Sequence, residues 1–157
     1  MVEIACKYVI APRKTIRVEL LFSNDSISFF GGVNAADGKV EDYRHGNYQH
    51  SMSNKAFAFP FGKGSSGAGL VLMEMIRLKT APAAIINIRT DPVILTGPLL
   101  SRHYYEQILP VINLNEQNYA RLANMKEVEL FSTGALLKAF PDRRQNNFAP
   151  GNHITDP

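Results

Sequence analysis

A mixed α/β fold is the class that this sequence predicts, because strand-like runs come first and helical and strand-like runs alternate afterwards. The run "TIRVELLF" (residues 15–22) alternates in its first half and is rich in apolar residues, so it predicts a strand. The run "AFAFPF" (residues 56–61) predicts a second strand, which ends or lies at a sheet edge at Pro60. An apolar helix-like run and a buried strand-like run follow, which is the order of a layered domain rather than of a β-sandwich.

Between these two strands, the chain combines another strand-like run with a long polar connection. The run "ISFFGGVN" (residues 27–34) predicts a strand that ends at the glycine pair 31–32, because glycine adopts backbone conformations closed to other residues. The Asp-Gly pair at 37–38 is typical of a hairpin turn. Residues 41–55 are polar without being of low complexity, so we expect an ordered surface connection there.

The most apolar part of the chain is "SSGAGLVLMEMIRLK" (residues 65–79), which predicts a helix. Its second half is interrupted only by Glu74, Arg77 and Lys79, and a helix that is apolar on most sides packs inside a layered domain. The run "PAAIINI" (82–88) then predicts a buried strand. The remaining expected elements are a helix over about 96–107, a strand over 108–114, a helix over 115–124 and a strand over 127–131.

The chain divides into a folded domain and a terminal tail. Its 157 residues suit one domain with a real hydrophobic core and are too few for two ordinary domains. The segment from Pro141 is rich in Pro, Asn and Asp and has no periodicity. We therefore expect residues 1–140 to form the domain and residues 141–157 to form an extended or disordered arm, or one that a partner orders.

Composition and charge exclude several classes of protein. Hydrophobic residues make up 45% of the chain and charged residues 20%, which is typical of a globular protein. The net charge of +3 comes without a dense block of Lys and Arg, so nucleic acid is not an expected partner. Cys6 is the only cysteine, which excludes disulfides and a metal site built from this chain's thiols alone. Lys7 and Pro12 break the first apolar run, so we expect no signal peptide, no membrane span and a cytoplasmic location.

The stretch "FPFGKGSSGAG" (residues 59–69) carries the strongest candidate for chemistry. Gly62 and Gly64 allow a tight turn, and either serine of the pair 65–66 can cap the first amides of the helix that follows. The same helix N-terminus is suited to an anion or to a reactive hydroxyl. It is not a phosphate-binding loop of the Walker type, because Lys63 is followed by glycine rather than by Ser or Thr. Capping and presentation of a hydroxyl both remain open from the pattern alone.

Two other groups of residues have a structural and a functional interpretation. His45 and His50 lie in a polar segment near Asp42, where they are either metal ligands or solvated loop residues. Asp91 follows a predicted strand and precedes a proline, so it either contacts a ligand or opens a turn. Arg89 either pairs with Asp91 or binds a carboxylate.

Several of these stretches, in this order and spacing, resemble the small swivelling domain of the aconitase X family. The markers are the Gly-Gly-Val-Asn stretch at 31–34, the Gly-Ser-Ser loop at 64–66, the Ala-Pro-Ala-Ala stretch at 81–84 and the Asp-Pro turn at 91–92. The resemblance covers roughly residues 15–115, which is most of the chain. Each marker alone is weak, whereas the combination is fairly specific.

The resemblance implies a swivelling β/β/α domain, as in the C-terminal domain of the aconitase superfamily, that closes over a partner's active site. It implies a hydro-lyase subunit that is inactive without a large subunit, binds no cofactor alone and forms a hetero-oligomer. The large subunit carries the iron or iron–sulfur centre, and the substrate is a small anionic hydroxy acid. By resemblance, Ser65 is the catalytic base. The expected substrate-binding residues are Lys63, Gly64, Ser66, Gly32 and Asn34.

The chain departs from the wider pattern at three places. Gly67 stands where an arginine follows the serine pair in the superfamily, and Lys63 stands where many relatives have arginine. The stretch His-Gly-Asn-Tyr-Gln at 45–49 replaces a His-Pro-Leu-Tyr-Gly stretch. The substrate contacts that these positions make in relatives are therefore not carried over to this chain.

Two activities of the family are candidates. The stretch 97–124 looks more like the members that dehydrate cis-3-hydroxy-L-proline, which we take as the leading substrate, with mevalonate 5-phosphate as the alternative. A phosphorylated substrate would require several cations, and only Lys63 lies in the loop. A non-catalytic binding or scaffold domain of the same fold is the rival interpretation, and an independent small enzyme ranks last because no other catalytic constellation lies near the loop.

Overall fold

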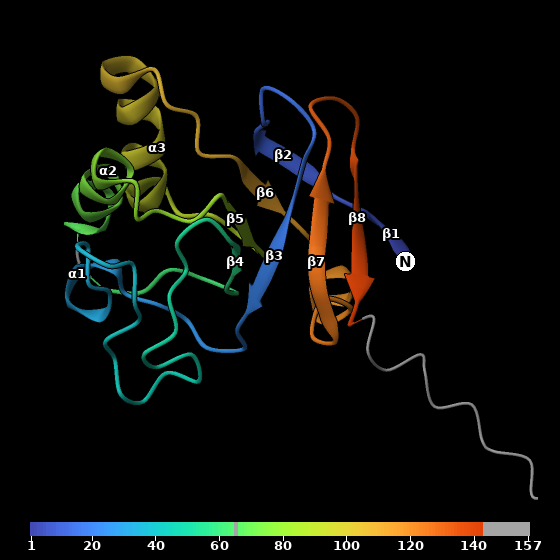
Figure 1. Cartoon of the computed structure of the whole chain (residues 1–157), viewed down its shortest axis with the longest axis horizontal. Helices are drawn as coiled ribbons and strands as arrows, with labels where there is room; N and C mark the ends of the chain where they lie inside the picture. The colour runs from blue at the N-terminus through green and yellow to red at the C-terminus, as the bar shows by residue number, and fades with distance from the viewer. Residues whose placement is uncertain (65, 143–157) are drawn as a thin grey trace, which may run out of the picture.

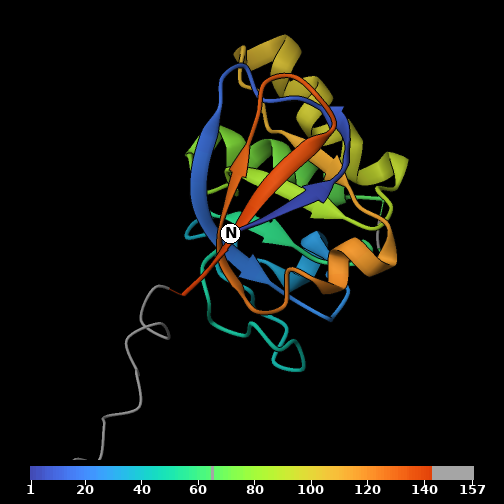
Figure 2. The same ribbon diagram turned by 90° about the vertical axis from the view of Figure 1, so that its right-hand side faces the viewer.

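Eight short strands form a nearly closed sheet in the computed structural model, which describes residues 1–64 and 66–142 (Figures 1 and 2). The strands are β1 (Val2–Ala5), β2 (Lys7–Ile10), β3 (Ile16–Phe22), β4 (Ala56–Ala58), β5 (Ala84–Asn87), β6 (Val111–Asn113), β7 (Met125–Leu130) and β8 (Leu136–Pro141). Their order across the sheet is β1-β8-β7-β3-β4-β5-β6-β2. β1 and β2 lie at the two ends of this order and are separated in the chain only by Cys6, which brings the two edges of the sheet close together.

The centre of the sheet is parallel and its flanks are antiparallel. β3, β4, β5 and β6 are parallel neighbours. The pairs β3–β7, β7–β8, β8–β1 and β6–β2 are antiparallel. Leu20 is paired with Ala56, and Ala56 with Ala84, so the carboxyl ends of the parallel strands lie along one edge of the sheet. The loop after β4 leaves the sheet at this edge, where ligand sites of open parallel sheets are commonly found.

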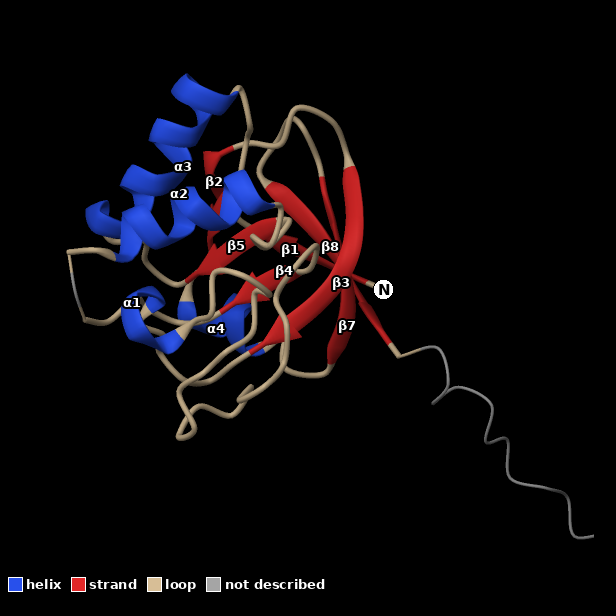
Figure 3. Cartoon of the chain, turned by 60° about the vertical axis from the view of Figure 1, so that its left-hand side comes forward, coloured by secondary structure: helices blue, strands red, loops and turns tan. Residues whose placement is uncertain are grey.

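Two of the described helices, α2 (Ala68–Leu78) and α3 (Pro92–Tyr105), cover one face of the parallel strands (Figure 3). The other described helices are α1 (Phe29–Gly32) and α4 (Glu116–Ala120). α2 and α3 lie side by side on the same side of the sheet, as Figure 3 shows. They provide the crossover connections that parallel strands require.

Alternation along the parallel strands separates two hydrophobic cores. Phe57 of β4 and Ile85 of β5 pack with Leu72 of α2 in the layer between sheet and helices. Ala58 and Ile86, one residue further along the same strands, belong to the core inside the nearly closed sheet. Successive side chains of a strand point to opposite faces, so a continuous apolar run fills both cores.

The predicted α/β class is confirmed, and most of the predicted strands are present within a few residues. The runs 15–22, 56–61, 82–88, 108–114 and 127–131 correspond to β3, β4, β5, β6 and β7. The strand predicted over 27–34 is wrong: Ile27 and Val33 form only isolated bridges, and the irregular α1 lies between them. Gly31 has φ +84, which is incompatible with a strand, and Phe29 is fully buried, so tertiary packing overrides the β propensity of this run.

The predicted helices have different boundaries in the structure. The helix predicted over about 96–107 begins earlier, at Pro92, because Asp91 caps it and proline suits the first helical turn. The helix predicted over 115–124 is limited to α4. The helix predicted over 65–79 starts at Ala68. No helix in the described ranges is long and apolar enough to cross a membrane.

Three strands were not predicted at all. β1 pairs with β8, from the opposite end of the described chain, and β2 pairs with β6. β8 includes Pro141, the first residue of the predicted tail. The rest of that prediction, from residue 143 onwards, lies outside the described residues.

Candidate functional site

The loop that follows β4 is tied to the segment before α1. The backbone N–H of Lys63 donates to the carbonyl oxygen of Ile27 at 2.9 Å, and Gly62 forms a bridge with Ile27. A Cβ on Gly62 would lie 2.7 Å from Asp91 Oδ2 and would collide with the Ile94 side chain, so this position needs glycine. The loop therefore leaves β4 in a direction fixed by two other segments.

Glycine is also required at the two positions that flank the serine pair. Gly64 has φ +92, and a Cβ there would lie 2.6 Å from Ser28 Oγ. A Cβ on Gly67 would lie 2.7 Å from the ring of Phe30. The loop consequently packs its backbone directly against Ser28 and Phe30.

The N-cap position of α2 is Gly67, and capping of the first helical amides by a serine of the pair stays a prediction. Ser66 precedes the cap and is exposed. Ser65, the predicted base, lies outside the described residues. The positive end of the α2 dipole begins directly after the serine pair.

An open hollow of about 400 Å³ lies beside this loop. Its lining comes from the α1 segment, from the polar segment that starts at Glu41, and from the loop: Ser28, Phe30, Gly31, Gly32, Glu41, Asp42, Tyr43, Arg44 and Lys63. The structure thus brings together two of the predicted substrate-binding residues, Gly32 and Lys63. Gly64 contacts Ser28 at the border of the hollow.

Two carboxylates and two cations line the hollow, and one of the carboxylates, Asp42, lies between the two cations. Lys63 Nζ lies 3.7 Å from Asp42 Oδ2, and Arg44 Nε lies 3.3 Å from Asp42 Oδ1. The backbone N–H of Arg44 also donates to Asp42 Oδ1 and, together with the side chains of Arg44 and Lys63, lowers the pKa of Asp42. Because Lys63 and Arg44 are mostly exposed, both retain donors for an anion.

Asn34 does not line the hollow. Its side-chain amide donates to Glu41 Oε1 at 2.9 Å, and its side-chain oxygen accepts from the N–H of Ala36. Asn34 therefore supports the segment that supplies Glu41. A direct role in substrate binding stays a prediction for all five of the expected residues: Lys63, Gly64, Ser66, Gly32 and Asn34.

Sequence patterns missed the residues of the hollow that come from the polar segment. Asp42 was considered only as a neighbour of the histidines, and Arg44 and Tyr43 were not considered. The signal that could have found them is the concentration of three charged residues and one tyrosine at 41–44, in a loop, where binding residues are common.

The other candidates make the following contacts. Asp91 Oδ1 accepts from the N–H of Ile94 at 2.9 Å, so Asp91 is the N-cap of α3, and a ligand contact of this residue stays a prediction. The Arg89 guanidinium lies 5.6 Å from the centre of the Phe61 ring. His45 is 4% exposed and hydrogen-bonded, so it is not the solvated loop histidine that one interpretation expected.

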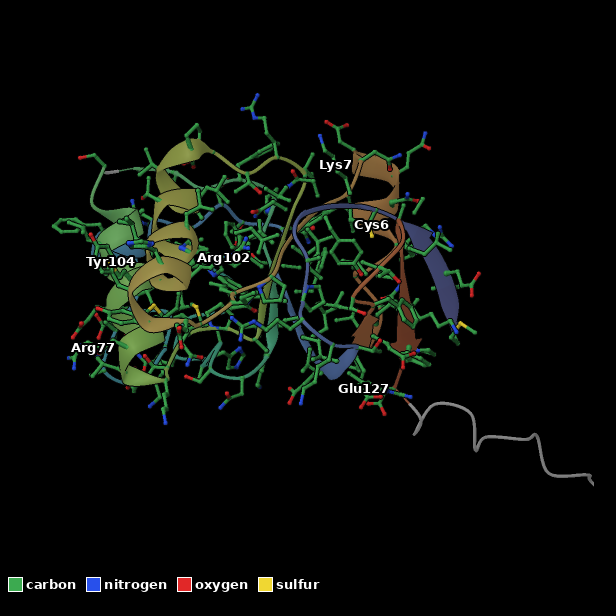
Figure 4. The ribbon with its side chains drawn as sticks, turned by 90° about the horizontal axis from the view of Figure 1, so that it is seen from above. Cys6, Lys7, Arg77, Arg102, Tyr104 and Glu127 are labelled. Atoms are coloured by element: carbon green, nitrogen blue, oxygen red, sulfur yellow. The ribbon has the colours of Figure 1, made fainter. Side chains whose placement is uncertain are left out.

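The described residues do not fit an iron or iron–sulfur centre. They contain no group of three or more His, Cys, Asp or Glu side chains that could hold a metal ion. Cys6 lies on the far side of the molecule from α2 and α3 (Figure 4). Burial raises the pKa of its thiol to about 11, whereas a metal ligand must be a thiolate.

Fold and loop together define an α/β domain with a glycine-rich loop at the carboxyl edge of its parallel strands. A model of the aconitase X swivel domain family matches residues 3–138. The chain therefore belongs to that family, and the resemblance inferred from the sequence is confirmed.

Similar proteins are dehydratases or their small subunits. The phosphomevalonate dehydratase small subunit of Methanosarcina mazei is 34% identical over 64% of this chain and 65% of its own length. The cis-3-hydroxy-L-proline dehydratase of Pseudomonas aeruginosa is 31% identical over 63% of this chain but only 17% of its own length. The crystal structure of Thermococcus kodakaraensis aconitase X in its holo-form matches with a TM-score of 0.76 and 20% identity, over 89% of this chain and 99% of that chain.

Proposed function

We propose that this chain is the small, swivelling subunit of an aconitase X-type dehydratase, and that its loop 61–67 completes the active site of a larger subunit. The observation that carries the proposal is the construction of the loop. Side chains at Gly64 and Gly67 would collide with Ser28 and Phe30, which also line the adjacent hollow. A loop fixed in this way keeps Lys63 and the two glycines that flank the serine pair beside the α1 segment that lines the hollow.

In this proposal, Ser65 is the base that removes a proton from the carbon next to the hydroxyl-bearing carbon. The hydroxyl group leaves and, with one proton, becomes water, while a carbon–carbon double bond forms. The balance requires no oxidant or reductant. A serine hydroxyl acts as a base only where its alkoxide is stabilised, and the positive end of α2 at Gly67 favours negative charge there. The assignment of Ser65 rests on its place in the sequence and on the family resemblance.

The proposed partner is a large subunit that carries the iron or iron–sulfur group, because the described residues of this chain do not fit that group. Large exposed apolar side chains around the loop are consistent with a surface that the partner subunit covers. Tyr43 is 75% exposed, Leu70 68% and Phe30 58%, and Tyr43 and Phe30 border the hollow itself. Exposed apolar residues in this number around one site are typical of an interface. A cytoplasmic location stays a prediction.

The substrate that we propose first is mevalonate 5-phosphate, in place of the cis-3-hydroxy-L-proline that the sequence alone favoured. The Methanosarcina mazei relative named for phosphomevalonate is a separate small subunit, as proposed for this chain, and is 34% identical over 100 residues, whereas the relative named for hydroxyproline is 31% identical over 99 residues. The structure also adds Arg44 to Lys63 in the same hollow, so the cations that a phosphate requires are not limited to the loop. cis-3-Hydroxy-L-proline is the second candidate, because the Pseudomonas aeruginosa relative is named for its dehydration.

The test is to produce the chain together with the large dehydratase subunit of the same source and to measure water loss from both substrates. We expect turnover of one substrate by the complex and a loss of about a thousandfold in kcat for S65A, the size typical of a removed acid–base group. S66A is the comparison variant: because Ser66 is a predicted substrate-binding residue rather than the base, its substitution should raise KM while kcat stays within about tenfold of the wild type. Full activity of S65A would refute the base, and a complex inactive on both substrates would favour the scaffold interpretation.

A further inference from the structure

His45 is a buried ionisable residue that the proposed reaction does not use. Its side chain is 4% exposed, and its ring centre lies 6.4 Å from that of Phe57 in the hydrophobic core. It directly follows Asp42, Tyr43 and Arg44, the residues that form one wall of the hollow. A histidine in this place needs a reason, because burial of an ionisable group is costly unless its polar atoms are satisfied.

The hydrogen bonds of His45 define its protonation state. The backbone N–H of Asn47 points to Nδ1 at 3.1 Å, so Nδ1 accepts and carries no proton. Nε2 then carries the proton and donates to Ser23 Oγ at 3.2 Å. Ser23 Oγ in turn donates to the carbonyl oxygen of Asp25 and accepts from its N–H. The network is complete only for the neutral imidazole with its proton on Nε2.

The bond from Asn47 N–H to His45 Nδ1 closes a turn of a kind that recurs in this part of the chain. Asn34, Asp37 and Asp42 each accept a hydrogen bond from the N–H two residues further on. His45 does the same with a ring nitrogen in place of an oxygen. A side-chain acceptor two residues before an N–H is what fixes such turns.

The same short segment is tied to the end of β3 by further bonds. The N–H of Gly46 donates to Asp25 Oδ2 at 2.8 Å, and the side-chain amide of Asn47 donates to the carbonyl oxygen of Phe22 at 3.1 Å. Tyr119 OH donates to the carbonyl oxygen of Ser23 at 2.7 Å and supports this anchor from α4. His45 lies between the anchor and the wall of the hollow, so its ring connects the two.

We propose that His45 is a positioning residue: as a neutral imidazole it fixes the turn after Arg44 and thereby holds Asp42 and Arg44 at the hollow beside Lys63. Protonation would place a hydrogen on Nδ1 against the N–H of Asn47, which breaks the turn. The wall then loses one of its ties, while the bonds from Gly46 to Asp25 and from Asn47 to Phe22 remain, and Arg44 is held less firmly at the hollow.

The charges around His45 act in opposing directions, and burial is the largest effect. Burial lowers the pKa of His45 and Lys63 lowers it further, whereas Asp25 and Asp42 raise it. The stabilisation from the neutral ring is therefore present above the ordinary pKa of 6.5 and is lost as the pH falls below it through the lowered pKa. Acid should loosen the wall before it unfolds the domain.

The first test is NMR of the full chain and does not depend on the proposed reaction. Long-range ¹⁵N–¹H spectra should show an unprotonated Nδ1 and a protonated Nε2 at neutral pH. On acidification, the amide resonances of Asp42, Arg44 and Asn47 should shift together with the titration of the ring. The proposal would be overturned by a proton on Nδ1 at neutral pH. It would also be overturned if the amide resonances of Asp42 and Arg44 did not shift when the ring titrates.

The second test uses three variants in the complex with the large subunit and rests on the proposed function. H45N keeps an acceptor two residues before Asn47 and should retain KM within about threefold of the wild type. H45A removes both bonds and should raise KM about tenfold with little change in kcat, which corresponds to one or two lost hydrogen bonds. H45Q, whose amide is placed to reach Ser23 but not the N–H of Asn47, should behave like H45A. Equal KM values for H45A and H45N would refute the positioning role, even in an active complex.

Discussion

Gly69 of α2 and Gly97 of α3 meet where the two helices pack together, and neither position has room for a side chain. A Cβ on Gly97 would lie 2.5 Å from the carbonyl oxygen of Gly69. A Cβ on Gly69 would lie 2.7 Å from the carbonyl oxygen of Val93 and would collide with Thr96 Oγ1. Because most of the obstructing atoms belong to the backbone, a side chain at either position would push the helices apart. The contact therefore sets the position of α2 and of the loop that precedes it.

The first prediction concerns this contact. G69A and G97A should each lower the free energy of unfolding by about 1–3 kcal/mol, the usual cost of overpacking a tight interface. Denaturant unfolding followed by circular dichroism measures the loss. G32A is the control, since the nearest atoms to its Cβ lie 3.8 Å away, which is ordinary contact. A loss for G32A equal to that of the other two would contradict the explanation.

The second prediction concerns the turn at Gly64. G64A adds a side chain at φ +92 and places it 2.6 Å from Ser28 Oγ, so the loop should move away from Ser28. Faster amide hydrogen exchange over residues 61–67 should report this movement while the global stability falls by only about 1–2 kcal/mol.

A matched control separates backbone strain from collision. Gly31 has a similar φ of +84, but nothing lies within 4 Å of its Cβ, so G31A introduces the strain alone. Adding S28A to G64A removes the hydroxyl in closest contact and should restore part of the slow exchange in the loop. If G31A disturbs residues 61–67 as much as G64A does, the collision with Ser28 is not the cause.

The third prediction concerns Lys63. K63M in the complex should raise KM for a phosphorylated substrate by about tenfold to a hundredfold, because a hydrogen bond to a charged group is lost. K63R should retain most of the affinity. K39M is the control, since Lys39 forms an ion pair with Asp37 at the same 3.7 Å but lies outside the hollow. A loss of affinity in K39M, or none in K63M, would remove Lys63 from the binding site.

The parallel strands and the central helix were predictable because their patterns are local. The run at 56–61 and the run at 82–88 are apolar on both faces, as strands covered on both sides must be. β1 was missed because it is only four residues long and pairs with β8, at the other end of the described chain, while β8 lies between that distant strand and β7. The false strand at 27–34 shows the reverse case, in which a β-rich run is bent by the burial of Phe29.

The site was predictable only where one short segment carries it. The glycines of the loop 61–67 lie close together in the sequence, and their spacing predicted a tight turn before a helix. The hollow is built from three segments, and the contact of Lys63 with Asp42 joins residues that no local pattern relates. The buried state of His45 was equally hidden, because its partners Ser23 and Asn47 come from a turn and a loop.

The last prediction concerns the reactivity of Cys6. Burial raises the pKa of its thiol to about 11 and that of the neighbouring Tyr8 hydroxyl to about 12, so only about one thiol in a thousand is ionised at pH 8. The thiolate is the reactive form, and alkylation by iodoacetamide should therefore be slow at pH 8 and should accelerate about tenfold for each unit of pH up to about 11. The Tyr8 hydroxyl forms a hydrogen bond with the thiol that lowers the pKa of Cys6. The Y8F variant removes this hydroxyl, so the pKa of Cys6 should rise further and the thiol should become still less reactive. Mass spectrometry of the native chain measures both rates. Rapid alkylation at pH 7 would show an ionised thiol, and the argument that Cys6 is unfit as a metal ligand would then fail.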